Sequence, residues 1–433
     1  MPINQESLLD ILRAQVIPAL GCTEPIAVAL AAARAREELG AIPDKMSVFV
    51  SLNIYKNSMG VYIPGTQEKG IYIAAALGML VGISSLKLQV LEKIEESSIM
   101  IAKQYIEQKH LNVTPVLERK GIYIKVEAIY EEKMCEVVIE GKHDHILSVK
   151  LNGQLVENFS HISNSSKSNS LDDLGKLKIS QLMKIIKGMK SSELEFLLNG
   201  VEMNRAIAKA GLKNKLGLAI GTGLNELIED GILGRDLIST IRIQTASAAD
   251  ARMNGLNLPV MTSGGSGNQG IVAILPIALA AEHYNIRPER LAKAIALSHI
   301  LNVYIKQYTG SLSAVCGCAV AAGAGASAAI AWMLDGTDDQ IAGAIKNIVG
   351  NLCGMICDGA KASCAFKLST ASTESILAAE LALKNVIIAE TDGIISSSAE
   401  ETIMNLGEIC AKGMDMADKT IMEVMMRKPV NCI

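Results

Sequence analysis

Residues 160–170 constrain the fold most, because they divide the chain into two parts with different hydrophobic patterns. The segment reads SHISNSSKSNS, and this excess of Ser and Asn is typical of a loop or linker. Segments before it alternate apolar and polar residues as half-buried strands do, at 46–54, 122–130, 134–140 and 145–151. The sequence after it shows no convincing alternation of this kind. We therefore predict an α+β domain over 1–165 and a larger all-α domain over 171–433.

Helical patterns surround the predicted strands, and helix start signals recur after the linker. In the first domain we expect helices over 7–15, 24–39, 71–82 and 98–110, beside a mixed or antiparallel sheet. In the second, Pro288 stands at a first helical position, and Thr337 with Gln340 forms a capping box. Ser372 or Thr373 is the expected cap of a further helix.

The charge balance excludes several classes of partner. The 433 residues include 41 Lys and Arg against 45 Asp and Glu, a formal net charge of -4, so no basic surface for nucleic acid is indicated. Hydrophobic residues make up 49% and charged residues 20%, which excludes a disordered chain. Aromatic residues are only 3%, which argues against a base-stacking platform.

Two long stretches without charged residues, 253–281 and 307–334, raise the question of a membrane span. Both are rich in Gly, Ala and Ser and poor in large apolar residues, so they would insert poorly, and we expect buried helices instead. The first residues, MPINQESLLD, lack the pattern of a secretory signal. We therefore expect a cytoplasmic protein whose nine cysteines stay reduced.

Five of these cysteines are concentrated in one region of the second domain: Cys316, Cys318, Cys353, Cys357 and Cys364. A helix would place Cys353 and Cys357 on one face, and Gly359 lets the chain turn back toward Cys364. Thiolates without a nearby His favour an iron–sulfur cluster over a catalytic zinc. The alternative is a set of buried cysteines in Ala-rich helices, as we expect for the isolated Cys135 and Cys410.

The segment TSGGSGNQG, 262–270, precedes an apolar helix and suits a bound carboxylate or phosphate. Its glycines expose backbone N–H groups, and a helix N-terminus adds partial positive charge. The candidate binding residues are Thr262, Ser263, Gly264, Gly265, Ser266 and Asn268. The segment matches no nucleotide-binding motif, and an ordinary glycine-rich turn is the alternative.

GCTEP, 21–25, stands at the start of another apolar helix. A thiol at a helix N-terminus has a lowered pKa, which would make Cys22 a ligand or a reactive group, but Thr23 could equally be a plain N-cap. Lys56 and Asn57 open a loop that could face the second domain.

Three further sites carry weaker indications. His143, Asp144 and His145 are expected in a solvated turn between two strands. His299 is expected to be a hydrogen-bonded core histidine. Lys361, between two clustered cysteines, could meet a carboxylate or act as a base, and a surface lysine is the alternative.

Five motifs together resemble a known family. GCTEP, KNSMGVYIPGT (56–66), TSGGSGNQG, CGCAVAAGAGAS (316–327) and CDGAKASC (357–364) resemble the L-cysteine desulfidase family, which is similar in turn to the iron–sulfur L-serine dehydratases. The motifs occur in the family's order over essentially the whole chain. The sequence departs from the pattern at 143–145, where HDH replaces the expected HTN, so no role is carried over to these positions.

The resemblance implies a PLP-independent α,β-elimination of L-cysteine to pyruvate, ammonia and sulfide, with an oxygen-labile 4Fe–4S cluster. The cluster ligands carry over to Cys357 and Cys364, with a third in CGC, where we prefer Cys318 to Cys316. Two domains that meet over the cluster are also implied. Three thiolates leave one iron open as a Lewis acid, whose further ligand is Cys22, Cys432 or solvent.

The catalytic residues expected on this basis are Cys22 and Lys361, and Thr23, Lys56, Asn57 and the glycine-rich segment are expected to bind the substrate. The expected partner is a small amino acid, with no nucleic acid and no membrane, and a homodimer is left open. L-Serine dehydratase is the alternative activity. A non-catalytic iron–sulfur or zinc sensor and a membrane carrier are hypotheses of other classes.

Overall fold

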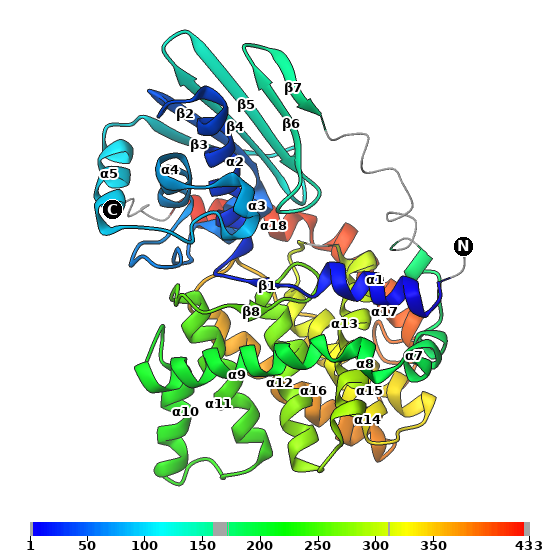
Figure 1. The fold of residues 1–433 in the computed structure, drawn as a ribbon. Coiled ribbons are helices and arrows are strands. Elements are labelled where there is room, and N and C mark those ends of the chain that lie inside the picture. Colours follow the sequence, from blue (N-terminus) through cyan, green and yellow to red (C-terminus); the bar gives the residue numbers. More distant parts are fainter. Residues whose placement is uncertain (1–2, 159–170, 172, 311, 428–433) are drawn as a thin grey trace.

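The computed structural model describes residues 3–158, 171, 173–310 and 312–427. The predicted linker at 160–170 and Cys432 therefore lie outside the described residues. The described chain forms a sheet with helices on one face, stacked on a larger helical part (Figure 1). The prediction of an α+β region with a mixed sheet and a larger helical part is confirmed in this outline.

The sheet of the first part is mixed. Its six strands are β2 (Lys45–Ser51), β3 (Leu111–Val116), β4 (Tyr123–Tyr130), β5 (Lys133–Glu140), β6 (Ile146–Leu151) and β7 (Gln154–Asn158). The spatial order is β3-β2-β4-β5-β6-β7, with β2 and β3 parallel and all other neighbours antiparallel. The antiparallel meander from β4 to β6 agrees with the predicted strands, whereas β3 and β7 were not predicted.

The first predicted strand extends three residues too far. The observed strand β2 ends at Ser51. The Oγ of Ser51 accepts a hydrogen bond from the Ile54 backbone N–H and caps α3 (Leu52–Ser58). Every residue of α3 is buried, so its apolar residues do not follow the helical period of 3.6. The alternation of the strand therefore continues in the sequence through residue 54. This helix carries Lys56 and Asn57 to the boundary between the two parts.

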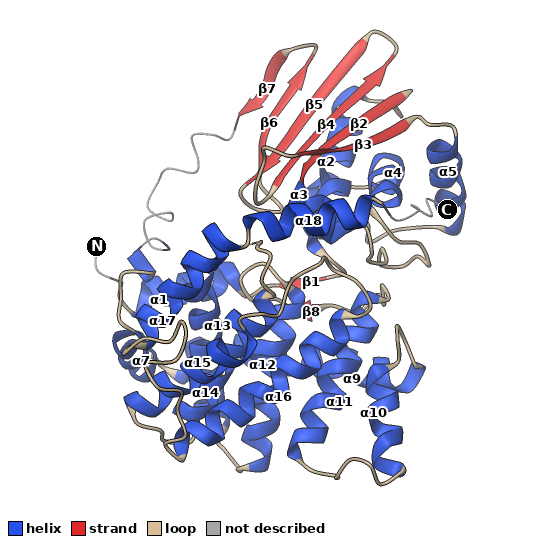
Figure 2. Ribbon diagram, turned by 180° about the vertical axis from the view of Figure 1, so that it is seen from behind, coloured by secondary structure: helices blue, strands red, loops and turns tan. Residues whose placement is uncertain are grey.

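Three helices cover one face of the sheet (Figures 1 and 2). They are α2 (Thr23–Leu39), α4 (Ile71–Val81) and α5 (Glu96–Glu107), with the 3-10 helix η1 (Ser84–Gln89) between the last two. Helix α2 lies between the sheet and α4, and its run of alanines, nearly all buried, allows close packing on both sides. A Cβ at Gly78 of α4 would overlap the backbone of Ala29 on α2.

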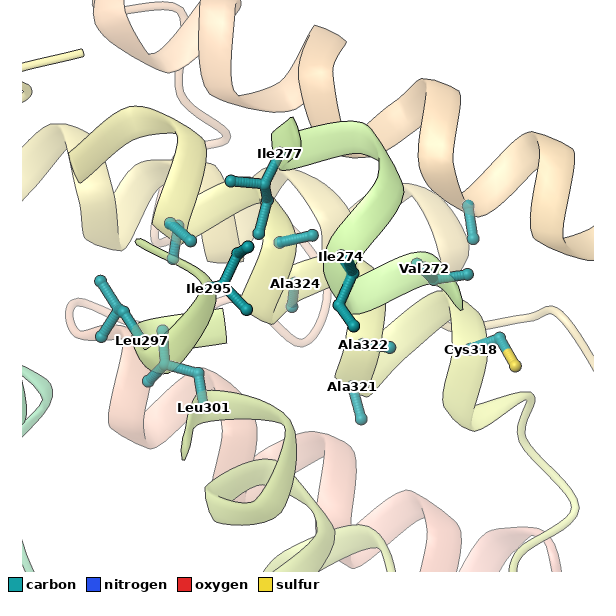
Figure 3. Close-up of a cluster of buried hydrophobic side chains, with 14 of the residues drawn as sticks. Val272, Ile274, Ile277, Ile295, Leu297, Leu301, Cys318, Ala321, Ala322 and Ala324 are labelled. Atoms are coloured by element: carbon teal, nitrogen blue, oxygen red, sulfur yellow. The ribbon is translucent and has the colours of Figure 1, made fainter. Parts of the chain in front are cut away.

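The second part is built from helices with small residues at their contacts. They are α7 (Ile179–Gly188), α8 (Ser191–Leu194), α9 (Phe196–Asn214), α10 (Ile220–Glu229), α11 (Leu237–Met253), α12 (Gly267–His283), α13 (Pro288–Thr309), α14 (Ala324–Met333), α15 (Asp338–Leu352), α16 (Cys364–Leu383) and α17 (Ala399–Glu408), with short π-helices η3 (Cys318–Gly323) and η4 (Ile409–Gly413). Figure 3 shows large side chains such as Ile274 and Leu301 around the alanines of η3. No helix in the described part of the chain is long and apolar enough to span a bilayer.

Two of the three predicted helix starts in this part are confirmed. Pro288 is the first residue of α13, and Thr337 with Gln340 forms the capping box of α15. The expected cap at Ser372 or Thr373 is wrong, because both residues lie inside α16, where the Thr373 hydroxyl donates to the Ser369 carbonyl. A Ser or Thr inside a helix satisfies its hydroxyl this way and imitates a capping signal in the sequence.

The two ends of the chain cross between the parts, which differs from the predicted division at 165 and 171. Helix α1 (Gln5–Gln15) buries Leu8 and Leu12 in the core of the helical part. Helix α18 (Asp415–Met426) runs back to pack on α3, and its Met422 joins the core beneath the sheet. Figure 2 shows α18 lying between the sheet and the helical part.

A two-stranded ribbon forms a further connection between α1 and the helical part. Strand β1 (Pro18–Ala19) pairs antiparallel with β8 (Val260–Met261), although no strand was predicted after the linker. The ribbon places GCTEP, which follows β1, beside TSGGSGNQG, which follows β8.

Replacing Gly78 with Ala tests the close contact between α2 and α4. The added methyl group has no space against Ala29, so we expect a loss of about 1–3 kcal/mol in the free energy of unfolding, measured by urea denaturation. Gly223→Ala is the matched control, since Gly223 lies in α10 and a Cβ added there would meet no atom within 4 Å. That control should be neutral or stabilising by about 0.5–1 kcal/mol. Equal losses in both variants would contradict the packing.

Candidate active site

A cavity of about 310 Å³ lies where the two parts of the protein meet. Both parts contribute to its wall, and several of the contributing residues are buried and charged. The polar and sulfur-bearing residues that line it include Cys22, Thr23, Glu24, Lys56, Asn57, His143, Arg252, Thr262, Ser266, Asn268, Lys306, Cys316, Cys318, Cys357, Cys364 and Lys367. The structure therefore brings together most of the residues that the sequence singled out.

Four thiols share one wall of the cavity. Cys316 and Cys357 lie on two loops that pair through backbone hydrogen bonds, from Cys316 N–H to Met355 O at 2.8 Å and from Cys357 N–H to Ala314 O at 2.6 Å. Cys318 begins η3, and its sulfur points away from the aliphatic side chains around it (Figure 3). Cys364 begins α16.

The thiols also influence one another's ionisation. A hydrogen bond from the Cys318 thiol lowers the pKa of Cys316 to about 6, and the same bond together with burial raises the pKa of Cys318. Burial raises the pKa of Cys364 to about 11 and also raises that of Cys357, which the Lys56 charge partly offsets. Several thiolates in one buried group need positive charge, either from nearby lysines or from a metal centre.

These thiols fit a polynuclear cluster better than a single ion. Among the described residues, no three His, Cys, Asp or Glu side chains converge to hold one metal ion. In an iron–sulfur cluster each thiolate binds a different iron, so its ligands need not converge on one point. Cys316, Cys318, Cys357 and Cys364 line a common cavity, as the ligands of such a cluster would.

Cys353 does not belong to this group. It caps the C-terminus of α15, outside the residues that line the cavity, while Cys357 lies four residues further along a loop. The prediction that one helix presents both thiols is therefore wrong, because α15 ends at Leu352. Cys135 and Cys410 are buried away from the cavity, as predicted.

The glycine-rich segment forms a second part of the cavity wall. Gly264 and Gly265 have φ values of +55° and +79°, which glycine adopts readily, and Ser266 caps α12 by accepting from the Gln269 N–H. Thr262, Gly264, Gly265, Ser266 and Asn268 line the cavity. Ser263 does not, because its hydroxyl turns into the helical core toward His299 and Asn302, both at 2.8 Å.

His299 is a hydrogen-bonded core histidine, as predicted. It is fully buried, and burial lowers its pKa to about 3, so its ring is neutral. It does not line the cavity, so it is not placed to act on a substrate there.

Arg252 connects the GCTEP and TSGGSGNQG loops of the site and was not predicted. It lies at the end of α11, is 3% exposed, and donates to Asn268 Oδ1 at 2.8 Å and to the Gly21 carbonyl oxygen. Its Nε is buried without a hydrogen-bond partner. A guanidinium with a free donor beside a glycine-rich loop is suited to a carboxylate.

Glu24 is a buried carboxylate held by neutral donors. Its Oε2 accepts from the Cys22 thiol at 2.9 Å and from the Thr23 hydroxyl at 3.2 Å, and its Oε1 accepts from the Asn57 amide at 3.0 Å. Burial alone would raise the pKa of Glu24, but nearby His143, the Cys22 hydrogen bond and Arg252 outweigh it and lower the pKa. Glu24 therefore carries a negative charge at neutral pH.

This arrangement overturns the prediction that Cys22 has a lowered pKa. Cys22 is the residue before α2, as expected, but burial and the adjacent Glu24 charge raise the pKa of its thiol. Cys22 is thus a neutral donor to Glu24, since a full negative charge two residues away outweighs the partial charge of the helix N-terminus.

Lys56 joins three segments at the edge of the site. It is 2% exposed, and its Nζ pairs with Asp418 of α18 at 2.6 Å and donates to the Cys357 carbonyl at 2.9 Å. The expectation that the loop starting at Lys56 faces the second part is confirmed. The role of Lys56 in the structure is to hold the Cys357 loop and α18 in place.

Lys361 is not part of the cavity wall. It pairs with Asp358 at 2.5 Å and donates to nearby backbone carbonyls, and it is not among the lining residues. Its position does not support the prediction of a catalytic base. Lys367, further along in α16, lines the cavity instead and also pairs with Asp358, at 2.6 Å.

Lys306 and His143 complete the site, one from each part. Lys306, on α13, donates to the Gly264 carbonyl at 2.5 Å, and burial lowers its pKa to about 8. His143, in the turn between β5 and β6, was expected in solvent, but its Nε2 is shielded from water and has no hydrogen-bond partner. The turn itself is exposed or half-exposed, as predicted, and only the ring atom Nε2 of His143 is withdrawn from water.

Comparison with known proteins identifies the family. Residues 86–423 match the family model described as serine dehydratase alpha chain. The chain belongs to the serine dehydratase alpha chain family. It is also 44% identical over 422 residues to a UPF0597 protein of Clostridioides difficile, covering 96% of this chain and 98% of the relative.

Other relatives of this chain span the same length. A UPF0597 protein of Clostridium tetani is 44% identical over 425 residues, covering 98% of this chain and 99% of that protein. One of Caldanaerobacter subterraneus is 41% identical over 421 residues, covering 97% and 98%. The similarity to these relatives therefore extends over both parts of the fold, and hence over both walls of the cavity.

The sequence contained one usable signal for the residues that were missed. Arg252 and Lys306 are the last charged residues before long uncharged stretches, which begin at Met253 and Gln307. A charge in such a place must be paired, capped or functional, because an unpaired buried charge is costly.

Glu24→Gln tests whether the ionised carboxylate holds this part of the site together. An amide puts donors where one oxygen now accepts, so we expect a loss of about 1–3 kcal/mol in unfolding free energy at pH 7. Folding lowers the pKa of Glu24, so its contribution is present above the ordinary value of about 4.3 and is lost as pH falls through the folded-state value.

The difference from wild type in guanidinium unfolding should thus shrink as pH falls below about 4. Glu107→Gln, at an exposed position at the end of α5, is the control and should differ little from wild type at either pH. A Glu24→Gln penalty that grows on acidification would contradict the proposed role of the charge.

Proposed function

We propose that this protein is an iron–sulfur lyase that removes the β-substituent of a small L-amino acid without PLP, with L-cysteine as substrate. L-Cysteine and water would give pyruvate, ammonia and sulfide. The observation that carries the proposal is that four thiols, three of them buried and Cys357 half-buried, line the same cavity as a glycine-rich segment and Arg252. Membership of a serine dehydratase family supports the reaction type.

The cluster would be held by Cys357, Cys364 and one thiol of the Cys316–Cys318 pair. When bound, a cluster with three protein ligands supplies an open iron that acts as a Lewis acid toward the leaving group. Cys318 remains the preferred third ligand, and the lowered pKa of Cys316 favours Cys316 as the alternative. Cys22 is engaged with Glu24, which supports a role in the substrate wall and not in ligation.

The residues of the chain would orient the substrate between the two walls. The Gly264–Gly265 turn, the α12 N-terminus and the Arg252 guanidinium provide donors for the substrate carboxylate. We assign Glu24 to the α-ammonium group, since Asp358 is paired with Lys361 and Lys367. This orientation directs the β-substituent toward the thiol wall.

L-Serine dehydration is the second candidate, because the matching family is named for serine. The leaving groups differ by one atom, hydroxide against hydrosulfide. A soft sulfur leaving group suits iron held by thiolates, which favours L-cysteine on chemical grounds. The cytoplasm is the proposed location, since a reducing compartment keeps the cysteines free to bind iron.

The substrate is tested by measuring pyruvate formation from L-cysteine and from L-serine with anaerobically reconstituted protein and no added PLP. We expect pyruvate and sulfide in equal amounts from L-cysteine, at a catalytic efficiency about tenfold or more above that for L-serine. A higher efficiency with L-serine would reassign the protein to serine dehydration. No pyruvate from either amino acid, with iron fully bound, would refute the elimination itself.

The ligand assignment is tested by replacing Cys357 and Cys364 separately with Ala. Each change removes one thiolate of the cluster, so iron content and pyruvate formation should fall together, to less than about a tenth of wild type. Cys353→Ala is the matched control, because this thiol lies nearby but outside the cavity, and it should keep both. Full iron and full turnover in either the Cys357 or the Cys364 variant would remove that residue from the ligand set.

A further inference from the structure

We propose that His143 is the residue that takes the proton from the substrate Cα. The inference rests on the proposed elimination and adds the group that was missing from it. It is drawn from the position of the ring in the cavity, from its free Nε2 and from the elimination of the other candidates.

The turn that carries His143 is held firmly between β5 and β6. The backbone N–H of Gly141 donates to the Ile122 carbonyl at 3.1 Å, and the N–H of His145 donates to the Lys142 carbonyl at 3.2 Å. The His145 ring is used within the turn, with Nδ1 at 3.1 Å from the Glu140 carbonyl. His143 is left to face the cavity, which it lines together with Lys142 and Asp144.

The ring is prepared to accept a proton. Its Nε2 is buried and has no partner in the described structure, which is costly unless a ligand supplies one. Burial lowers the pKa of His143, and the positive charge of Lys306 on α13 adds to this effect. The negative charges of Glu24 on α2 and Asp144 in the same turn oppose this effect but do not outweigh it, so the ring is neutral at neutral pH. Once the ring takes a proton, the same two charges stabilise the imidazolium.

Three other titratable groups that line the cavity are engaged. Glu24 accepts three hydrogen bonds that stabilise its charge, which makes it a weak base. The Lys306 ammonium donates to the Gly264 carbonyl, and Lys367 pairs with Asp358. Of these cavity residues, His143 is the one with a free acceptor atom.

The step balances within the proposed reaction. The Cα proton moves to Nε2, the Cα–H electron pair forms the Cα–Cβ double bond, and the C–S pair leaves with hydrosulfide. The imidazolium then returns its proton to Cβ as the aminoacrylate becomes an imine and its nitrogen loses a proton to solvent. Water hydrolyses the imine to pyruvate and ammonium. Because His143 belongs to the sheet and the thiols to the helical part, the step requires both parts to be in contact.

The test compares His143→Asn and His143→Ala with wild type after anaerobic reconstitution. We expect unchanged iron content, a kcat lower by about 10²–10⁴-fold and a KM within a few fold of wild type. In wild type, kcat/KM should fall with acidification through a pKa below the ordinary histidine value of about 6.5, and the residual activity of the variants should lack this limb. Added imidazole should restore part of the kcat of His143→Ala.

His145→Gln is the matched control, two residues away in the same turn and outside the cavity, and it should keep the wild-type kcat and pH profile. An active wild type with a His143→Asn variant of equal kcat and the same acid limb would overturn the assignment and leave the elimination intact. An iron-loaded wild type that forms no pyruvate would overturn the elimination, and the role of His143 with it. Loss of iron in both His143 variants would make the residue structural and would also overturn the proposal.

Discussion

A carboxylate buried at the junction of the two parts, Glu24, is the constraint on which the site depends. Removing an ionised group from water is costly, and three neutral donors from two neighbouring segments offset that cost here. The arrangement fixes the start of α2 against α3 and gives the neighbouring Arg252, Lys306 and His143 a common counter-charge. The positions of these groups therefore depend on one another.

The two ends of the chain cross the junction and tie the two parts of the protein together. Helix α1 is anchored in the helical core, and α18 packs on α3 beneath the sheet. Lys56 then links α18 to the Cys357 loop through Asp418. A shift of α18 would move Asp418 and, through Lys56, the Cys357 loop. These two contacts connect the C-terminal helix to the thiols of the site.

The sequence predicted the architecture and the two most prominent walls of the site. Alternation located β4, β5 and β6, and the spacing of cysteines and glycines located the thiol loops and the segment 262–270. These features are local, so composition and period are enough to find them. The short ribbon of β1 and β8 is held by long-range pairing and left no such pattern.

The residues that were missed depend on contacts between the two parts. His143 belongs to a turn that is largely accessible to solvent, and only its Nε2 is shielded from water in the cavity. Arg252 is an ordinary helix end in the sequence, and only the structure shows that it donates to Gly21 and Asn268. The direction of a side chain at such positions is decided by tertiary contacts, which sequence spacing does not encode.

The proposed function depends most directly on an iron–sulfur cluster surrounded by the four thiols. Iron, zinc and acid-labile sulfide should therefore be measured in protein purified without oxygen, together with the visible absorption spectrum before and after exposure to air. We predict about four irons and four sulfides per chain and a brown colour that fades in air. Colourless protein that binds zinc, or no metal at all, after anaerobic reconstitution with iron and sulfide would contradict the cluster and the elimination that needs it.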